Sequence, residues 1–496
     1  MLLVILFMIS FLVGNAQHVT TNGPEIGMDE GARVTVLGED EDNIYFCSVN
    51  RGYFGGDDVM FVTVYDKKKR SVVIEHEIDE DYGFTTAFMQ GDNVVLAGST
   101  YNKKTKSVEF FQYAFPVMNK RKGKIESKVV YSVPAQGTKY NWYEVLRSAD
   151  GQVVAYLTYL RPSSRDAEEY TLDVMVCGIG GNEIAHTQEK IHGECPNMVK
   201  GFLADNGTVY VEEHYRTNQK VSSGGTMLMF STAESLRYVT ITADKQIKPV
   251  QLEPEVESIG NSYAELLADQ RLMVFGSAKG GVGMFVLDKD GEVAKYGIYE
   301  GEIPNLPENV KYDYDFYNEN RLSFKPYQIL SLQDGRVLVL AHQHMYSLVS
   351  NGNSVRSYND HTNLYLYLFD EEMEPVAFVT RPYGSQSSGD KHEDLPVALE
   401  WGGELRLLFN GQVSNYTGKA GRVWKVLNAT KMEERCLVLG VLDNELQFDP
   451  KIIRQPAPKK PFTSGEYFEQ LLKVTEDAVY IINHINIDNF IEEIEF

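Results

Sequence analysis

One pattern recurs eight times along the chain. It consists of an apolar segment, a turn of two to four residues rich in Asp, Asn and Gly, and a second apolar segment; YQILSLQDGRVLVLAHQH, residues 327–344, is one copy. Such turn residues suit tight hairpins because they adopt a positive φ or hydrogen-bond to their own backbone. The first apolar residues after the turns are Ile44, Val94, Val153, Val209, Leu272, Val337, Leu405 and Val479.

A second hairpin follows most of the first ones, as in GMFVLDKDGEVAKYG from residue 283 and LYLYLFDEEMEPVAFVT from residue 364. Each repeat is therefore predicted to contain four short antiparallel strands, which we call A to D. Successive repeats are 50 residues apart at the closest (Ile44 to Val94) and 74 at the widest (Leu405 to Val479). Four-stranded repeats at this spacing, with loop insertions, are typical of a β-propeller.

Residues 337–340 are apolar at consecutive positions, which indicates a strand buried on both faces, as in a blade between two others. Ring closure also removes exposed sheet edges. A β-helix would have a shorter repeat, immunoglobulin-like domains need about 100 residues each, and an α/β fold needs helices between its strands. We therefore expect an all-β propeller of eight blades, or of seven if one hairpin is an accessory. The last repeat is short, so the N-terminal strand is expected to complete the final blade and close the ring.

Composition excludes some classes of function. Asp and Glu total 70 against 47 Lys and Arg, a net charge of −23, and such a surface repels nucleic acids and anionic lipids. Residues 1–13 are apolar and too short to span a bilayer comfortably. Gly14 and Ala16 suit a cut before Gln17, although no basic residue precedes the apolar run. We expect a signal peptide over residues 1–16, a single propeller domain over 17–496 and no membrane insertion.

The Asn-Ala-Gln ending of this segment, residues 15–17, resembles that of secreted proteins of the Bacteroidetes. Removal of the expected signal peptide, together with this resemblance, implies a secreted, periplasmic or cell-surface protein. An oxidising compartment permits disulfides, and Cys177 and Cys195 are close enough in sequence to form one. The alternative is that the four cysteines are small buried hydrophobic residues.

The A–B turns and most C–D turns are tight, whereas the B–C and D–A connections are often long, as is expected of residues 344–363 and 381–394. In a propeller blade these two sets lie on opposite faces, so the variable sequence is expected on one face, where ligands usually bind. One long connection, KYDYDFYNEN from residue 311, alternates aromatic rings that could stack on sugars with carboxylates that could accept hydroxyl protons. The alternative is that its aromatic rings pack on the scaffold. The candidate ligand-binding residues are Tyr312, Asp313, Tyr314, Asp315, Phe316 and Tyr317.

His342 and His344 are two positions apart, so they lie on one side of a strand and can share a divalent metal. His361 and His392, in segments expected to be long loops, are candidates for a third ligand. The alternative is a pair of hydrogen-bonded histidines at a strand end. No other cofactor is expected.

No serine-hydrolase elbow, zinc-protease helix motif or glycine-rich phosphate loop occurs in the chain. The absence of a catalytic motif favours a non-enzymatic binding or assembly module, with a protein or an extracellular glycan as its partner. The alternative is a glycan hydrolase or lyase with acidic residues in the central channel, because 70 carboxylates always allow a catalytic pair to be imagined.

Overall fold

The computed structural model describes the strands and many of their connections. The residues described are 19–26, 33–50, 59–78, 84–119, 127–162, 169–193, 195–196, 198–223, 226–241, 247–250, 259–278, 281–300, 311–312, 323–350, 355–388, 395–416, 423–424, 427–428, 435–454, 467–485 and 488–495. The predicted signal peptide, residues 1–16, lies outside them.

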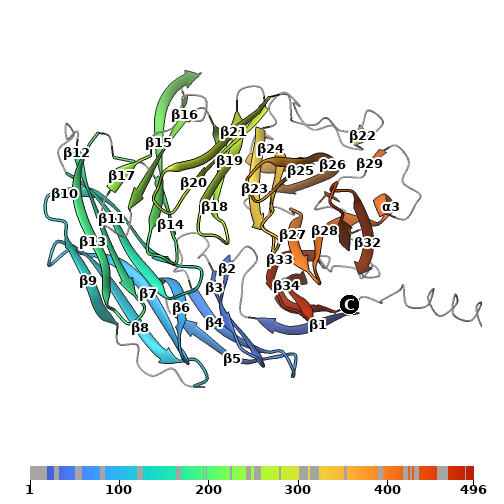
Figure 1. Cartoon of the computed structure of the whole chain (residues 1–496), viewed down its shortest axis with the longest axis horizontal. Helices are drawn as coiled ribbons and strands as arrows, with labels where there is room; N and C mark the ends of the chain where they lie inside the picture. Colours follow the sequence, from blue (N-terminus) through green and yellow to red (C-terminus); the bar gives the residue numbers. More distant parts are fainter. Residues whose placement is uncertain are drawn as a thin grey trace, which may run out of the picture.

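Eight small antiparallel sheets follow one another around a ring (Figure 1). The prediction of an all-β propeller is confirmed, with eight blades rather than seven. Blades 1 to 4 consist of β2 (Arg33–Glu39), β3 (Asn43–Asn50), β4 (Val59–Asp66) and β5 (Ser71–Ile78); β6 (Phe84–Gln90), β7 (Asn93–Asn102), β8 (Ser107–Pro116) and β9 (Lys128–Pro134); β10 (Thr138–Arg147), β11 (Val153–Pro162), β12 (Glu169–Gly178) and β13 (Glu183–His192); and β14 (Met198–Leu203), β15 (Val209–Ser223), β16 (Thr226–Ile241) and β17 (Ile247–Pro249).

Blades 5 to 8 complete the ring. They consist of β18 (Gly260–Leu266), β19 (Leu272–Ala278), β20 (Gly281–Leu287) and β21 (Val293–Glu300); β23 (Ser323–Ser331), β24 (Val337–Ser350), β25 (Val355–Phe369) and β26 (Pro375–Ser388); β27 (Val397–Trp401), β28 (Glu404–Gln412), β31 (Arg435–Leu442) and β32 (Phe448–Arg454); and β33 (Tyr467–Val474), β34 (Ala478–Ile485), β35 (Asp488–Glu495) and β1 (Val19–Ile26). The A strands of neighbouring blades contact one another, so strand A is innermost.

The described residues contain eight apolar clusters, one between each pair of neighbouring blades. Strand β3 shows how one strand serves two of them: Ile44 and Phe46 pack against blade 8, while Tyr45 and Cys47 pack against blade 2. Its two faces are both buried because blades flank it on both sides. This explains why the second strand of each repeat is apolar at consecutive positions.

The N-terminal strand β1 pairs with β35, the third strand of blade 8, from Val19 opposite Glu495 to Ile26 opposite Asn489. Ile26 is buried in the cluster between blades 8 and 1, together with Phe46 and Tyr480. The two ends of the described chain therefore belong to one sheet, where β1 lies beside the last strands (Figure 1).

Polar contacts connect the A–B ends of successive blades, on what we call the tight-turn face. The Asp205 amide of blade 4 donates to Gln270 Oε1 of blade 5 at 2.7 Å, and the Gln333 amide of blade 6 donates to Glu400 Oε2 of blade 7 at 2.7 Å. Further contacts join blades 3 and 4, 5 and 6, 7 and 8, and 8 and 1. Among the described residues, these contacts join six of the eight pairs of neighbouring blades.

The opposite face, which carries the B–C and D–A connections, we call the long-loop face. Two segments that the sequence suggested as loops are strand here: β24 and β25 form a hairpin across residues 344–363, and β26 continues to Ser388. The interpretation of these segments as loops is therefore wrong. Polar composition did not prevent strand formation because each strand pairs with its neighbour along most of its length.

Candidate functional site

On the long-loop face, two long connections form additional secondary structure beside blades 6 and 7. The connection from blade 5 to blade 6 contributes β22 (Lys311–Tyr312), and the insertion in blade 7, residues 413–434, contributes α3 (Val413–Tyr416), β29 (Val423–Trp424) and β30 (Leu427–Asn428). Strand β22 pairs in parallel with β29, and β30 pairs in parallel with the end of β26, as a fifth strand of blade 6. Figure 1 shows β22 and β29 beside blade 6, and α3 beside β32 of blade 7.

A cluster of three histidines lies on blade 6. Strand β24 alternates its side chains, so His342 and His344 continue the face of Leu338 and Leu340, which packs against blade 7. The third histidine is His361, which is paired with His344 on the neighbouring strand β25.

A β-bulge brings His361 to this face. The register is His342 with Leu364 and then Gln343 with Thr362, so Asn363 is the extra residue. Its φ is 53°, a conformation that Asn tolerates better than most residues, and its Nδ2 donates to Gln343 Oε1 at 2.8 Å. Without the extra residue, the alternation of side chains would direct His361 away from the other two histidines.

The three imidazole rings are close together. Ring centroids are 4.8 Å apart for His342 and His361, 5.0 Å for His344 and His361, and 6.0 Å for His342 and His344. His342 and His361 are fully buried, whereas His344 is partly exposed. The Tyr327 ring lies 5.2 Å from the His342 ring. Neither ring nitrogen of His342 has a hydrogen-bond partner among the described residues.

Burial lowers the pKa of His342 well below its usual value, and repulsion from His361, Lys325 and His344 lowers it further. His342 is therefore neutral at neutral pH, the form in which imidazole binds metals. As the side chains stand, no group of three or more His, Cys, Asp or Glu residues in the described part of the chain is arranged to hold a metal ion.

The predicted site residues are placed as follows. His342 and His344 lie on one face of β24, and their predicted role as metal ligands stays a prediction. Tyr312 lies in β22, where its backbone pairs with Trp424. Asp313, Tyr314, Asp315, Phe316, Tyr317 and His392 lie outside the described residues.

A buried polar cluster lies between blades 3 and 4, and its residues were not among those predicted from the sequence. Glu213 on β15 is fully buried and accepts hydrogen bonds from the hydroxyls of Tyr159 (2.8 Å), Tyr170 (3.1 Å) and Tyr215 (2.8 Å). Arg237 Nε lies 3.0 Å from Glu213 Oε2. A similar group, Arg454 with Glu492 and Asn483, lies between blades 7 and 8. No spacing rule in the sequence identifies either group, because each combines side chains from two neighbouring blades.

The inner strands of blades 3 to 5 carry a third polar group. Burial raises the pKa of Glu144 on β10 to about 7, opposed by a backbone hydrogen bond from Gly201 and by the charge of Lys200. Burial also raises the pKa of Glu265 on β18. Lys200 on β14 donates to the carbonyl of Ala264 at 3.2 Å.

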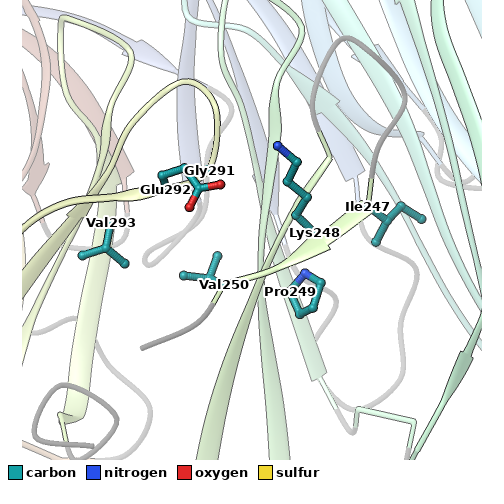
Figure 2. A pocket seen from close by; sticks show the side chains of 7 residues that line it. All are labelled: Ile247, Lys248, Pro249, Val250, Gly291, Glu292 and Val293. Atoms are coloured by element: carbon teal, nitrogen blue, oxygen red, sulfur yellow. The ribbon is translucent and has the colours of Figure 1, made fainter. Parts of the chain in front are cut away.

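A pocket of about 280 Å³ lies elsewhere, between β17 of blade 4 and the C–D turn of blade 5. Figure 2 shows the residues that line it, among which Lys248 and Glu292 carry charge. The C–D turns belong to the tight-turn face, so this pocket does not coincide with the features gathered at blades 6 and 7.

Two further findings bear on the sequence predictions. None of the four cysteines forms a disulfide, so Cys177 and Cys195 are not bonded to each other; Cys47 and Cys436 are buried and Cys177 and Cys195 partly so. Among the described residues, no helix is long and apolar enough to cross a membrane.

No protein-family model matches the chain, and no curated protein matches it. Among solved structures, it is similar to the β-propeller domain of the Trilobed protease from Pyrococcus furiosus, with 12% identity and a TM-score of 0.34 over 86% of this chain and 97% of that one. It is also similar to the WD40 domain of SCAP from fission yeast, with 10% identity and a TM-score of 0.32 over 97% and 99%.

A third similar structure is an acylaminoacyl peptidase from Pyrococcus horikoshii, with 10% identity and a TM-score of 0.31 over 77% of this chain and 58% of that one. Scores this low carry no argument about function. The assignment of the chain as an eight-bladed β-propeller depends on its own strand pairing.

Proposed function

We propose that the protein is a secreted or cell-surface binding or assembly module, and that its long-loop face at blades 6 and 7 binds a protein or an extracellular glycan. A propeller supports binding or scaffold roles in general. The observation that carries the finer proposal is the difference between the two faces.

The tight-turn face has short turns connected from blade to blade, which leave little sequence free to form a binding surface. On the long-loop face, two connections far apart in sequence pair with each other through β22 and β29, and one of them adds β30 to blade 6. Such structured connections on a rigid scaffold are where ligand-binding residues usually occur.

A glycan array probed with the purified chain, followed by reducing-end assays on each bound glycan, tests the proposal. We expect saturable binding without turnover, weakened at least tenfold by Tyr312→Ala combined with Trp424→Ala. The matched control is Asp290→Ala at an exposed position of a tight turn, which should bind like the wild type. Loss of binding in the control, or equal binding by the double variant, would contradict the proposed face.

If no glycan binds, a pull-down with the same three proteins from the extracellular fraction of the source cells tests the protein partner. One stoichiometric protein that is retained by the wild type and Asp290→Ala, and lost by the double variant, would support assembly on this face. A partner retained equally by all three would contradict it.

A second function, cleavage of a glycan as a hydrolase or a lyase, is favoured by one observation. Glu144 combines a raised pKa with a carboxylate atom, Oε2, that has no hydrogen-bond partner among the described residues, on an innermost strand. A carboxyl group that holds its proton near neutral pH can act as a general acid. Turnover in the reducing-end assay that is abolished by Glu144→Gln would support this function over simple binding.

A further inference from the structure

We propose that His342, His344 and His361 bind one transition-metal ion of the zinc class through their three imidazole rings. This inference goes beyond the binding proposed for the long-loop face and does not depend on it.

The first observation is geometric. Three histidines from two paired strands occupy one face, and their ring centroids are 4.8–6.0 Å apart. Zinc–nitrogen distances of about 2.0–2.1 Å and tetrahedral angles place the centroids of two imidazoles on one ion about 5 Å apart. The spacing therefore suits a shared ion.

The second observation is the state of His342. It is fully buried, and both its ring nitrogens have no hydrogen-bond partner among the described residues. Burying such a group without a partner is unfavourable, and buried polar groups are normally satisfied. A metal ion bound by one ring nitrogen would compensate for part of this cost.

The rings must rotate to bind, because their present arrangement does not hold a metal. Binding therefore requires the buried rings of His342 and His361 to turn about their two side-chain torsions, of which the outer one is broad. The bulge at Asn363 already fixes the backbone positions from which the rings would converge.

The ligand set indicates which metals would bind. Three neutral imidazoles without a carboxylate favour Zn²⁺, Cu²⁺, Ni²⁺ or Co²⁺ over Ca²⁺ and Mg²⁺, which prefer oxygen. Three protein ligands also leave a fourth position for water or another ligand. His344 is partly exposed, so an ion would enter the site from its side.

The experiment uses the full chain without an affinity tag, made metal-free with a chelator. We expect calorimetry to show about one equivalent of Zn²⁺, and Co²⁺ to give the visible bands of a tetrahedral site. His344→Gln and His361→Gln should each weaken Zn²⁺ binding at least tenfold. The exposed histidine His192 on blade 3 provides the control, and His192→Gln should leave binding unchanged.

A fourth variant, His342→Leu, tests whether binding can be lost in a protein that still folds. Leucine continues the apolar face of Leu338 and Leu340, so this protein should fold. We expect Zn²⁺ to raise the melting temperature of the wild type but not that of His342→Leu. The inference is overturned if the wild type binds no Zn²⁺ or Co²⁺, or if His342→Leu and His361→Gln bind as tightly as the wild type. These measurements do not involve a glycan or a protein partner, so they fail or succeed separately from the proposed function.

Discussion

Glu213 lies in the buried polar cluster between blades 3 and 4. Its carboxylate has no exposure to solvent and accepts hydrogen bonds from three tyrosine hydroxyls, beside Arg237. Glu213→Ala should lower the free energy of unfolding by about 3–5 kcal/mol, because the arginine and the hydroxyls lose their shared acceptor. Urea unfolding measures this. Glu189→Ala, an exposed position on β13, should change it by less than about 0.5 kcal/mol; equal losses would show that the buried group contributes nothing specific.

Glu144 makes stability depend on pH. Its folded-state pKa is raised from 4.5 to about 7, mainly by burial, so the folded protein holds this proton more tightly than the unfolded chain. The contribution is complete below pH 4.5 and is lost as the pH rises towards 7. Glu144→Gln should therefore flatten the decline in unfolding free energy across this window. Urea unfolding from pH 4.5 to 7.5 checks it, with the exposed Glu77→Gln as the control; an unchanged slope would contradict the raised pKa.

At the scale of elements, the bulge in β25 determines which side chains share a face. Asn363 has a φ of 53° and hydrogen-bonds to Gln343. Asn363→Gly should be tolerated, whereas Asn363→Val should destabilise the protein by about 1–2 kcal/mol, because a β-branched residue is strained at positive φ. Thermal unfolding of the two variants distinguishes them. Equal melting temperatures would mean that the strand can slip to a regular register.

At the scale of the whole molecule, strand β1 connects the beginning of the chain to its last blade. A chain that begins after residue 26 loses the β1–β35 ladder and the buried side chain of Ile26. Burial of that side chain alone contributes about 1.5–3 kcal/mol. The truncated protein should melt several degrees lower, and a peptide of residues 19–26 added in excess should restore part of the loss. A chain that begins at residue 17 is the control and should melt like the full chain; no difference between the two would show that β1 does not stabilise the ring.

Much of the fold could be predicted because hairpin turns and apolar strands are recognised from residues close together in the sequence. Each of the eight apolar residues that follow a predicted turn lies within the first two residues of a B strand, from Ile44 in β3 to Val479 in β34. Hairpin turns and alternating or continuous apolar runs depend on neighbouring residues only, so they can be read from short windows. The same reading failed for residues 344–363, where polar residues form a paired hairpin.

The candidate site was less predictable. The i, i+2 spacing of His342 and His344 indicated a shared face, and His361 was one of two candidates to join them. The bulge at Asn363 places His361 beside the other two histidines, and no sequence pattern predicts this bulge. Tyr159 and Tyr170 were missed as partners of Glu213 because hydrogen bonds between blades join residues more than 40 positions apart.

The amino-acid sequence by itself indicated a propeller of eight or seven blades, four strands in most of them, and the assignment of each connection to one end of its blade, because hairpin chemistry and strand burial are set by adjacent residues. The tertiary structure decided for eight blades. The tertiary structure alone decided which connections pair with each other, which buried carboxylates meet an arginine, and how three imidazoles come to share a surface. Those outcomes depend on register and on packing between blades, where a shift of one residue turns a side chain to the opposite face.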